Sequence, residues 1–256
     1  MSDMLVYLYA VGGAALRTVL PSGLSGIGDA PVRVLVADRL AAVVSSVDPL
    51  NFGAEPLRRN LEDLSWLAST ARAHHAVVDA VWRREPVAPL RLATVYVDDD
   101  NVRAMLHSRE AAFLALLDRV RGRQEWGVKA FAVPDSDDEP DEDDDDDRKL
   151  GPGAAYLQRK RETRDRTSRL RGKVHDAVED LHRVLAASAE HSRRYVLQDP
   201  RLSGHPPDLA LNAAYLVEQS ASSDFTSAVD HWRSPYLQVE LTGPWAPYSF
   251  ATLEES

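Results

Sequence analysis

The stretch EWGVKAFAV, residues 125–133, opens the part of this chain whose order of elements decides the fold. It predicts a strand over residues 126–133. A long helix is expected over residues 154–189 and a short one over residues 225–232. Further strands are expected over residues 193–197, 209–217 and 236–241. The resulting order, βαββαβ, predicts a ferredoxin-like domain, in which a four-stranded antiparallel sheet carries both helices on one face.

The residues before this domain alternate between strand and helix patterns. Short apolar runs predict strands over residues 4–10, 32–37 and 40–47, the last two joined as a hairpin at Asp38-Arg39. Apolar side chains then recur at three- and four-residue spacings, which predicts an amphipathic helix of about seven turns. The side chains of this stripe are Leu57, Leu61, Leu64, Leu67, Ala71, Val78 and Val81.

A further strand and helix complete the first half of the chain. Residues 90–97 predict a strand, and Asp99 or Asp100 can cap a helix that carries apolar side chains from Val102 to Val120. A length of 256 residues favours two domains. We therefore expect an α+β class: a mixed α+β domain over residues 1–122, a modified ferredoxin-like domain over residues 123–243, and an aromatic tail over residues 244–256.

The acidity of the chain is concentrated in one segment. Eleven of the 40 acidic residues lie in residues 135–147, which leaves 29 against 30 lysines and arginines elsewhere. Like charges repel, and nothing in this run can be buried, so we expect residues 134–148 to form a disordered insertion within the second domain. Binding of a cation or of a basic partner is the alternative.

Composition excludes several classes of protein. The chain has no cysteine, so disulfides, thiolate nucleophiles and cysteine-based metal sites are absent, which suits a reducing cytoplasm. No apolar run approaches the roughly 20 residues that span a bilayer. The first residues, MSDMLVYLYAV, lack the basic region of a signal peptide. We expect a cytoplasmic protein without a membrane partner.

No motif of known catalytic chemistry is present. Phosphate-binding and nucleophile-elbow patterns are missing, and the glycines of residues 23–28 precede a strand instead of a helix. His74 and His75 are adjacent, whereas a chelating pair on a helix needs a spacing of three or four, so a packing role is favoured. Residues 98–100 are acidic and suit helix capping. We predict no catalytic, cofactor or metal site and no small-molecule substrate, although an enzyme with an unrecognised site stays open.

The basic stretch of residues 158–173 has two interpretations. It carries eight lysines and arginines, which attract nucleic acid phosphates. Glu162 and Asp165 interrupt it, no aromatic residue lies within it, and the acidic run nearby would repel phosphate. A solvated helix face, or an intramolecular partner for the acidic run, is therefore preferred to nucleic acid binding.

The tail places three aromatic side chains between prolines. Trp245, Tyr248 and Phe250 lie around Pro244 and Pro247, beyond the last expected strand. Restrained aromatic residues offer large contact area at low entropic cost. The tail either folds back over its own domain or presents these three residues to a partner protein.

With these segments in view, the chain resembles the gas vesicle protein F/L family over nearly its whole length. The matching segments are YLYAV (7–11), AAVVSSV (41–47), WLASTARAHHAVVDAV (66–81), PLRLATVY (89–96), EWGVKAF (125–131), GPGAAYLQRKR (151–161), AAYLV (213–217) and GPWAPYSFA (243–251). The chain departs from the family pattern at Ala73-His74-His75, Leu92-Ala93 and Ala246-Pro247.

This resemblance implies both a fold and a role. It implies the two domains described above and an accessory or minor structural component of gas vesicle assembly. The implied partners are the small hydrophobic main shell protein and other accessory proteins, and the implied location is the cytoplasm and the gas vesicle. No catalytic set belongs to the family.

Overall fold

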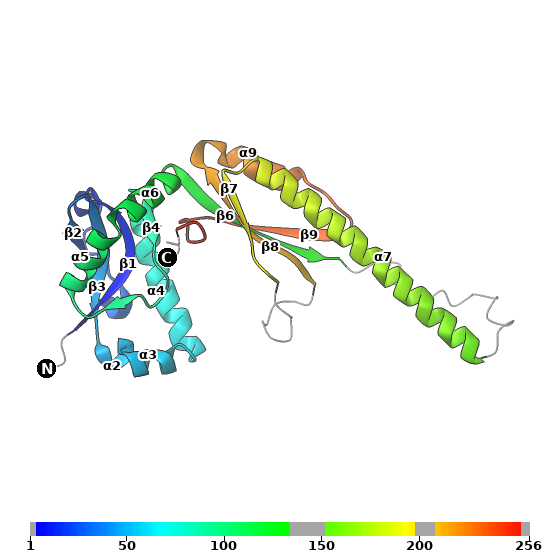
Figure 1. The fold of residues 1–256 in the computed structure, drawn as a ribbon, viewed down its shortest axis with the longest axis horizontal. Helices are drawn as coiled ribbons and strands as arrows, with labels where there is room; N and C mark the ends of the chain where they lie inside the picture. Colours follow the sequence, from blue (N-terminus) through cyan, green and yellow to red (C-terminus); the bar gives the residue numbers. More distant parts are fainter. Residues whose placement is uncertain (1–3, 134–151, 198–207, 252–256) are drawn as a thin grey trace. The chain divides into compact units, whose positions relative to one another are not determined.

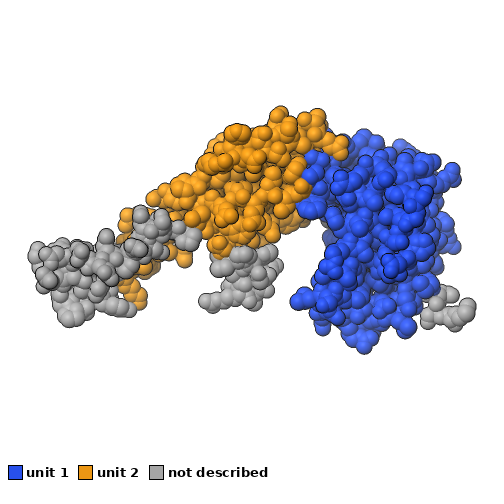
Figure 2. Space-filling model, turned by 180° about the vertical axis from the view of Figure 1, so that it is seen from behind, with its two compact units in different colours: residues 1–125, 244–256 blue, residues 126–243 orange. Residues whose placement is uncertain are grey.

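The protein is described by a computed structural model that covers residues 4–133, 152–197 and 208–251. The chain forms two compact units (Figure 2). Unit 1 contains Met1–Glu125 and Pro244–Ser256, and unit 2 contains Trp126–Gly243. The division thus falls three residues beyond the one expected near Gly122, and the tail belongs to unit 1. Since the expected insertion of residues 134–148 lies outside the described residues, the structure does not test it.

Unit 1 is built on an antiparallel sheet (Figure 1). Its strands are β1 (Leu5–Gly13), β2 (Arg33–Ala37), β3 (Leu40–Val47), β4 (Val87–Pro89) and β5 (Val95–Tyr96). The order is β2-β3-β1-β4, and β5 also pairs with β1. The hairpin expected at Asp38-Arg39 is confirmed, with Ala37 opposite Leu40 and a positive φ of 50° at Asp38.

Helices cover both faces of this sheet. The helical segments of unit 1 are α1 (Leu16–Val19), η1 (Ile27–Asp29), α2 (Pro49–Phe52), α3 (Ala54–Asn60), α4 (Leu64–Trp82), α5 (Asp99–Ser108) and α6 (Glu110–Val120). Val6 and Leu8 of β1 pack towards α5 and α6, whereas Tyr7 and Tyr9 pack towards α4. Strand β1 is therefore buried on both sides, which explains its nearly continuous apolar sequence.

The prediction of one continuous helix of about seven turns is wrong. The expected helix is divided into α3 and α4, because the Asp63 side chain accepts hydrogen bonds from the backbone N–H of Ser65 and Trp66 and begins a new helix. Leu61 and Leu64 consequently do not continue the buried stripe and are exposed.

Two expectations for residues 90–120 also need correction. The strand expected over residues 90–97 is reduced to β5, and β4 ends before it at Pro89. Ala93, between β4 and β5, has a positive φ of 64° and donates its N–H to the Tyr7 hydroxyl. The following helix is divided into α5 and α6 at Arg109, whose φ and ψ are −119° and 18°. The N-cap of α5 is Asp98, whose side chain accepts a hydrogen bond from the Asn101 N–H. The expected caps, Asp99 and Asp100, lie inside the helix.

Unit 2 has the order expected of a ferredoxin-like domain. Its strands are β6 (Arg123–Ala132), β7 (His191–Arg194), β8 (Leu209–Glu218) and β9 (Leu237–Trp245), and its helical segments are α7 (Pro152–Ala187), η3 (Gln219–Ala221) and α9 (Ser222–His231). The sheet order is β7-β8-β6-β9, so the first and third strands of the domain are central. The α+β class is confirmed.

Helices α7 and α9 of unit 2 lie on the same side of its sheet (Figure 1). The shared core contains Leu181 and Leu185 of α7, Phe225 of α9, and alternate residues of the strands such as Val128 and Tyr215. β9 is longer than expected and ends at Trp245, so the tail begins as the end of a strand. In the described parts of the chain, no helix has the length and apolar character needed to cross a bilayer.

Candidate functional site

The aromatic tail is mostly inside unit 1. Phe250 is 9% exposed and Tyr248 is half-buried, whereas Trp245 at the end of β9 is 40% exposed. Ala246 and Tyr248 join the core between the sheet and α4, and Ala251 joins the core on the other face. The tail therefore folds back, but over the first unit instead of the ferredoxin-like one.

A buried carboxylate anchors this tail. Glu125 accepts hydrogen bonds from both the backbone N–H of Ser249 (2.7 Å) and its hydroxyl (2.5 Å). The two residues are 124 positions apart in sequence, and Glu125 is buried. Hydrogen bonds to a charged acceptor are stronger than neutral ones. This contact therefore fixes the backbone between Tyr248 and Phe250.

Trp245 lies against one of the two histidines of α4. Its ring centroid is 5.3 Å from that of His75, in an edge-on arrangement at 69°. The Tyr248 ring lies 6.2 Å from His74 and 6.3 Å from His75. One edge of this aromatic group, formed by Trp245, is accessible to solvent. Of the three tail residues expected to bind a partner, only Trp245 is presented in this way.

His74 is a core residue, which agrees with the packing role favoured for the histidine pair. Its Nδ1 is 3.0 Å from the Tyr7 hydroxyl, and its side chain is buried against Tyr7 and Tyr9. Burial lowers the pKa of His74 to about 4, the neighbouring His75 acts in the same direction, and the Leu90 backbone opposes them. His74 is thus neutral at physiological pH.

The described residues contain no group of three histidine, aspartate or glutamate side chains that could hold a metal ion. Asp98 acts as a helix cap, as its position suggested, and a hydrogen bond from the Asn101 backbone is the main reason that its pKa is lowered.

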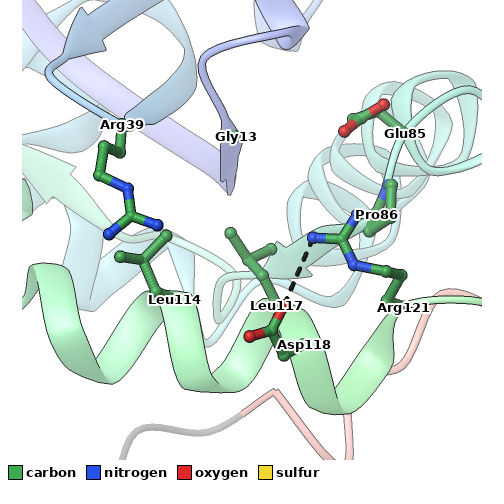
Figure 3. A pocket seen from close by; sticks show the side chains of 8 residues that line it. All are labelled: Gly13, Arg39, Glu85, Pro86, Leu114, Leu117, Asp118 and Arg121. Atoms are coloured by element: carbon green, nitrogen blue, oxygen red, sulfur yellow. Dashed lines mark hydrogen bonds and ion pairs between the residues drawn. The ribbon is translucent and has the colours of Figure 1, made fainter.

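A small hollow lies in unit 1. It measures about 160 Å³ and is lined by two arginines, two acidic residues and apolar groups (Figure 3). Arg121 and Asp118 are paired across 3.4 Å, so part of its charge is already balanced within the protein. Its lining residues are Gly13, Arg39, Glu85, Pro86, Leu114, Leu117, Asp118 and Arg121. No nucleophile of the serine or threonine type lines it.

Three exposed leucines belong to the segment that contains α2, α3 and the start of α4. Leu50 is 76% exposed and Leu64 is 79% exposed, and Leu61 is also exposed. The Asn60 side-chain amide donates to the Asn51 carbonyl oxygen (3.1 Å), which holds the end of α3 beside α2. We call Leu50, Leu61 and Leu64 the leucine corner; it lies at the end of unit 1 where α2, α3 and the start of α4 meet (Figure 1).

The leucine corner could not be found from sequence periodicity. Leu61 and Leu64 fit the spacing of a buried stripe, and only the capping bonds of Asp63 turn them outward. Large apolar side chains that are exposed together mark interaction sites more often than single exposed ones do. Unit 1 therefore leaves three large apolar side chains accessible to solvent in this segment.

Comparisons with known proteins identify the family. The family model for the gas vesicle synthesis protein GvpL/GvpF matches residues 5–252. Gas vesicle protein L of Streptomyces sp. (strain CB03234) is 42% identical over 254 residues, which cover 99% of this chain and 95% of that protein. Gas vesicle protein F of the same strain is 27% identical and covers 96% of this chain and 99% of its own length.

A solved structure shows the same fold. The crystal structure of the gas vesicle protein GvpF from Anabaena sp. PCC7120 has a TM-score of 0.67 at 20% sequence identity, with 99% of this chain and 98% of that chain covered. The family model spans nearly the whole chain, and the similarity to the Streptomyces L protein extends over almost all of both proteins. The chain therefore belongs to the gas vesicle synthesis protein GvpL/GvpF family.

Proposed function

We propose that this protein is a non-catalytic accessory or minor structural component of gas vesicle assembly that acts in the cytoplasm on the growing vesicle. Its partners are the small hydrophobic main shell protein and other accessory proteins of the vesicle. An apolar shell subunit must be shielded from water until it joins the shell, since exposed apolar surface drives association. That task needs a binding surface instead of a reaction centre.

The exposure of the leucine corner carries this proposal. Leu50 and Leu64 each leave most of their side chain in water, at the junction of three helices. Covering one such side chain with an apolar partner contributes about 1.5–3 kcal/mol. The corner therefore favours an apolar partner and supports the shell protein as its ligand.

Trp245 is a second contact residue in this proposal. It is the accessible member of the aromatic group on α4, whereas Tyr248 and Phe250 support the tail from inside unit 1. Tryptophan is enriched among residues that dominate binding energy. Its role is to extend the contact beyond the leucine corner or to bind a second accessory protein.

Co-purification with the main shell protein tests the leucine corner. The variant carrying Leu50→Ser and Leu64→Ser changes exposed side chains only, so it is expected to fold like the unchanged protein and to recover at least tenfold less shell protein. The matched control is Val196→Ser, because Val196 is 92% exposed but lies in unit 2. If the double variant and the control recover equal amounts of shell protein, the leucine corner does not bind it. If the unchanged protein recovers no shell protein, the proposal of shell-protein binding is wrong.

Testing the tail as a contact surface requires a point substitution instead of a truncation. Removing residues 244–256 would also remove Ala246 and Ala251 from the cores of unit 1. Trp245→Ala changes only the exposed member of the group. Loss of a bound partner by this variant, with an unchanged unfolding midpoint, supports a contact at Trp245; unchanged binding of every vesicle protein tested removes Trp245 from the interface.

A further inference from the structure

Strand β7 forms one edge of the sheet of unit 2 (Figure 1). Among the described residues it pairs with β8 alone, in an antiparallel register that sets His191 opposite Leu216. All of its residues are exposed, and the exposed Tyr195, Val196 and Leu197 follow directly. An exposed strand edge is a template for pairing with a further strand.

The hydrogen bonds to β8 decide which backbone groups of this edge point away from the sheet. The Tyr195 N–H donates to the Asn212 carbonyl oxygen (2.8 Å), so these two residues form a hydrogen-bonded pair. Such pairs recur at every second residue of an antiparallel ladder. The N–H and C=O groups of Ser192, Arg194 and Val196 therefore point outward, towards the position that a further strand would take.

The side chains of this edge alternate between the two faces of the sheet. The Arg194 guanidinium pairs with Glu179 of α7 (2.7 Å), so Arg194 lies on the face that the helices cover. Arg193 and Tyr195 consequently lie on the opposite face, where the Arg193 guanidinium is 5.9 Å from the centre of the Tyr195 ring. A cation and an aromatic ring thus lie two positions apart on one face of the edge.

We propose that β7 pairs with β7 of a second copy of this chain, antiparallel and centred on Arg194. In this register the outward backbone groups of Ser192 face those of Val196 in the second copy, and Arg194 faces itself. Arg193 lies directly opposite Tyr195 of the second copy, and the twofold symmetry repeats this contact. Cross-strand contacts between a cation and an aromatic ring stabilise such a pairing.

The pattern of charges favours this register and a second copy as the partner. Centring the pairing on Arg193 would set two guanidinium groups directly opposite each other, which is unfavourable. Centring it on Tyr195 would remove both contacts between arginine and tyrosine. Arg194 faces itself at the centre, but its ion pair with Glu179 offsets the repulsion. The edge is therefore complementary to itself. It lies in unit 2, so its pairing does not depend on the leucine corner of unit 1.

Cysteine cross-linking tests the register, because the chain has no cysteine of its own. Ser192→Cys and Val196→Cys are prepared as separate full-length variants and mixed in equal amounts. Hydrogen-bonded neighbours have Cα atoms about 5.5 Å apart, which a disulfide can bridge. After mild oxidation the mixture should give about tenfold more cross-linked dimer than either variant alone, since two copies of one variant hold their cysteines about 13 Å apart along the strands.

Sedimentation equilibrium tests the pairing itself. Ser192→Pro removes one outward N–H, a change that an edge strand tolerates, and should raise the dissociation constant of the dimer about tenfold. Ser192→Val is the matched control, because valine keeps the N–H and favours strands. This control should dimerise like the unchanged protein.

Three results would overturn the proposal. An unchanged protein that stays monomeric at every concentration would show that the edge does not pair with a second copy. Equal cross-linking of the mixture and of the single variants would show that random collisions join the cysteines. Equal dissociation constants for Ser192→Pro and Ser192→Val would place the contact between copies elsewhere on the surface.

Discussion

At the scale of single residues, His74 links the stability of unit 1 to pH. The folded protein buries the ring against Tyr7 and lowers its pKa from 6.5 to about 4, because burial disfavours the charged form. The unfolded chain binds a proton on this side chain below pH 6.5, whereas the folded protein resists protonation until about pH 4. The stabilisation is therefore complete above pH 6.5 and is lost as the pH falls towards 4.

The first prediction follows from this shift. The free energy of unfolding should fall by at most about 3 kcal/mol between pH 6.5 and pH 4 because of His74. Urea unfolding of the unchanged protein and of His74→Gln, measured across this range, isolates the contribution. The variant should be less stable at pH 7 and should show a smaller pH dependence. Parallel curves for the two proteins would contradict a buried neutral His74.

The second prediction concerns the anchor of the tail. Ser249→Ala removes the hydroxyl that donates to the buried carboxylate of Glu125. Loss of one donor to a buried charge should lower the free energy of unfolding by about 1–3 kcal/mol. Thermal unfolding measures the change, and Ser69→Ala serves as control, since its exposed hydroxyl only donates to the Trp66 carbonyl of the same helix. Equal losses of unfolding free energy in the two variants would show that the hydrogen bond to Glu125 does not stabilise the protein more than an exposed one.

At the scale of secondary structure, capping bonds decide which side chains face solvent. Asp63 begins α4 with two hydrogen bonds from backbone N–H groups, and Leu64 directly after it points outward. The spacing of apolar residues predicted that Leu61 and Leu64 belong to the core, because the prediction treated residues 57–81 as one continuous helix. The helix start at Asp63 thus accompanies the exposure of Leu64, whereas Leu50 lies on α2, which Asp48 caps.

The third prediction tests this cap. Asp63→Ala should lower the free energy of unfolding by about 1 kcal/mol, because two backbone N–H groups at the helix start lose their acceptor. Glu62→Ala is the control, since Asp63 and not Glu62 supplies the cap. Urea unfolding provides the comparison. A larger effect of the Glu62 substitution would contradict the capping assignment.

At the scale of the whole molecule, the last residues of the chain belong to the first unit. The chain passes from unit 1 to unit 2 after Glu125 and returns after Gly243. The tail then adds Ala246, Phe250 and Ala251 to the buried residues of unit 1. The stability of unit 1 therefore depends on residues that follow unit 2 in sequence.

The fourth prediction follows from this return. Removing residues 244–256 should accelerate hydrogen exchange in β1 and α4 strongly, since burial of Phe250 alone contributes about 1.5–3 kcal/mol. Exchange in the core of unit 2, at Leu181 and Tyr215, should change little, because these residues pack within their own sheet and helices. A uniform acceleration in both units would contradict the division.

The sequence determined the elements whose signals are local. Apolar runs specified β1, β3 and β8, and the order of elements after Glu125 specified the ferredoxin-like arrangement of unit 2. A packing role could be favoured for the pair His74-His75 from their adjacent positions, although the spacing did not say which of them is buried. These features follow from side-chain periodicity, which depends only on neighbouring residues.

Tertiary structure alone decided the features that depend on distant partners. The sequence left open whether the tail folds back or faces a partner. In the structure Glu125 binds Ser249, and Tyr248 and Phe250 lie in unit 1, which leaves Trp245 at the surface. The expected strand over residues 90–97 is reduced to β5, and the Tyr7 hydroxyl accepts from Ala93, 86 positions away. No local pattern encodes such contacts, because their stabilisation exists only once both chain segments are folded side by side.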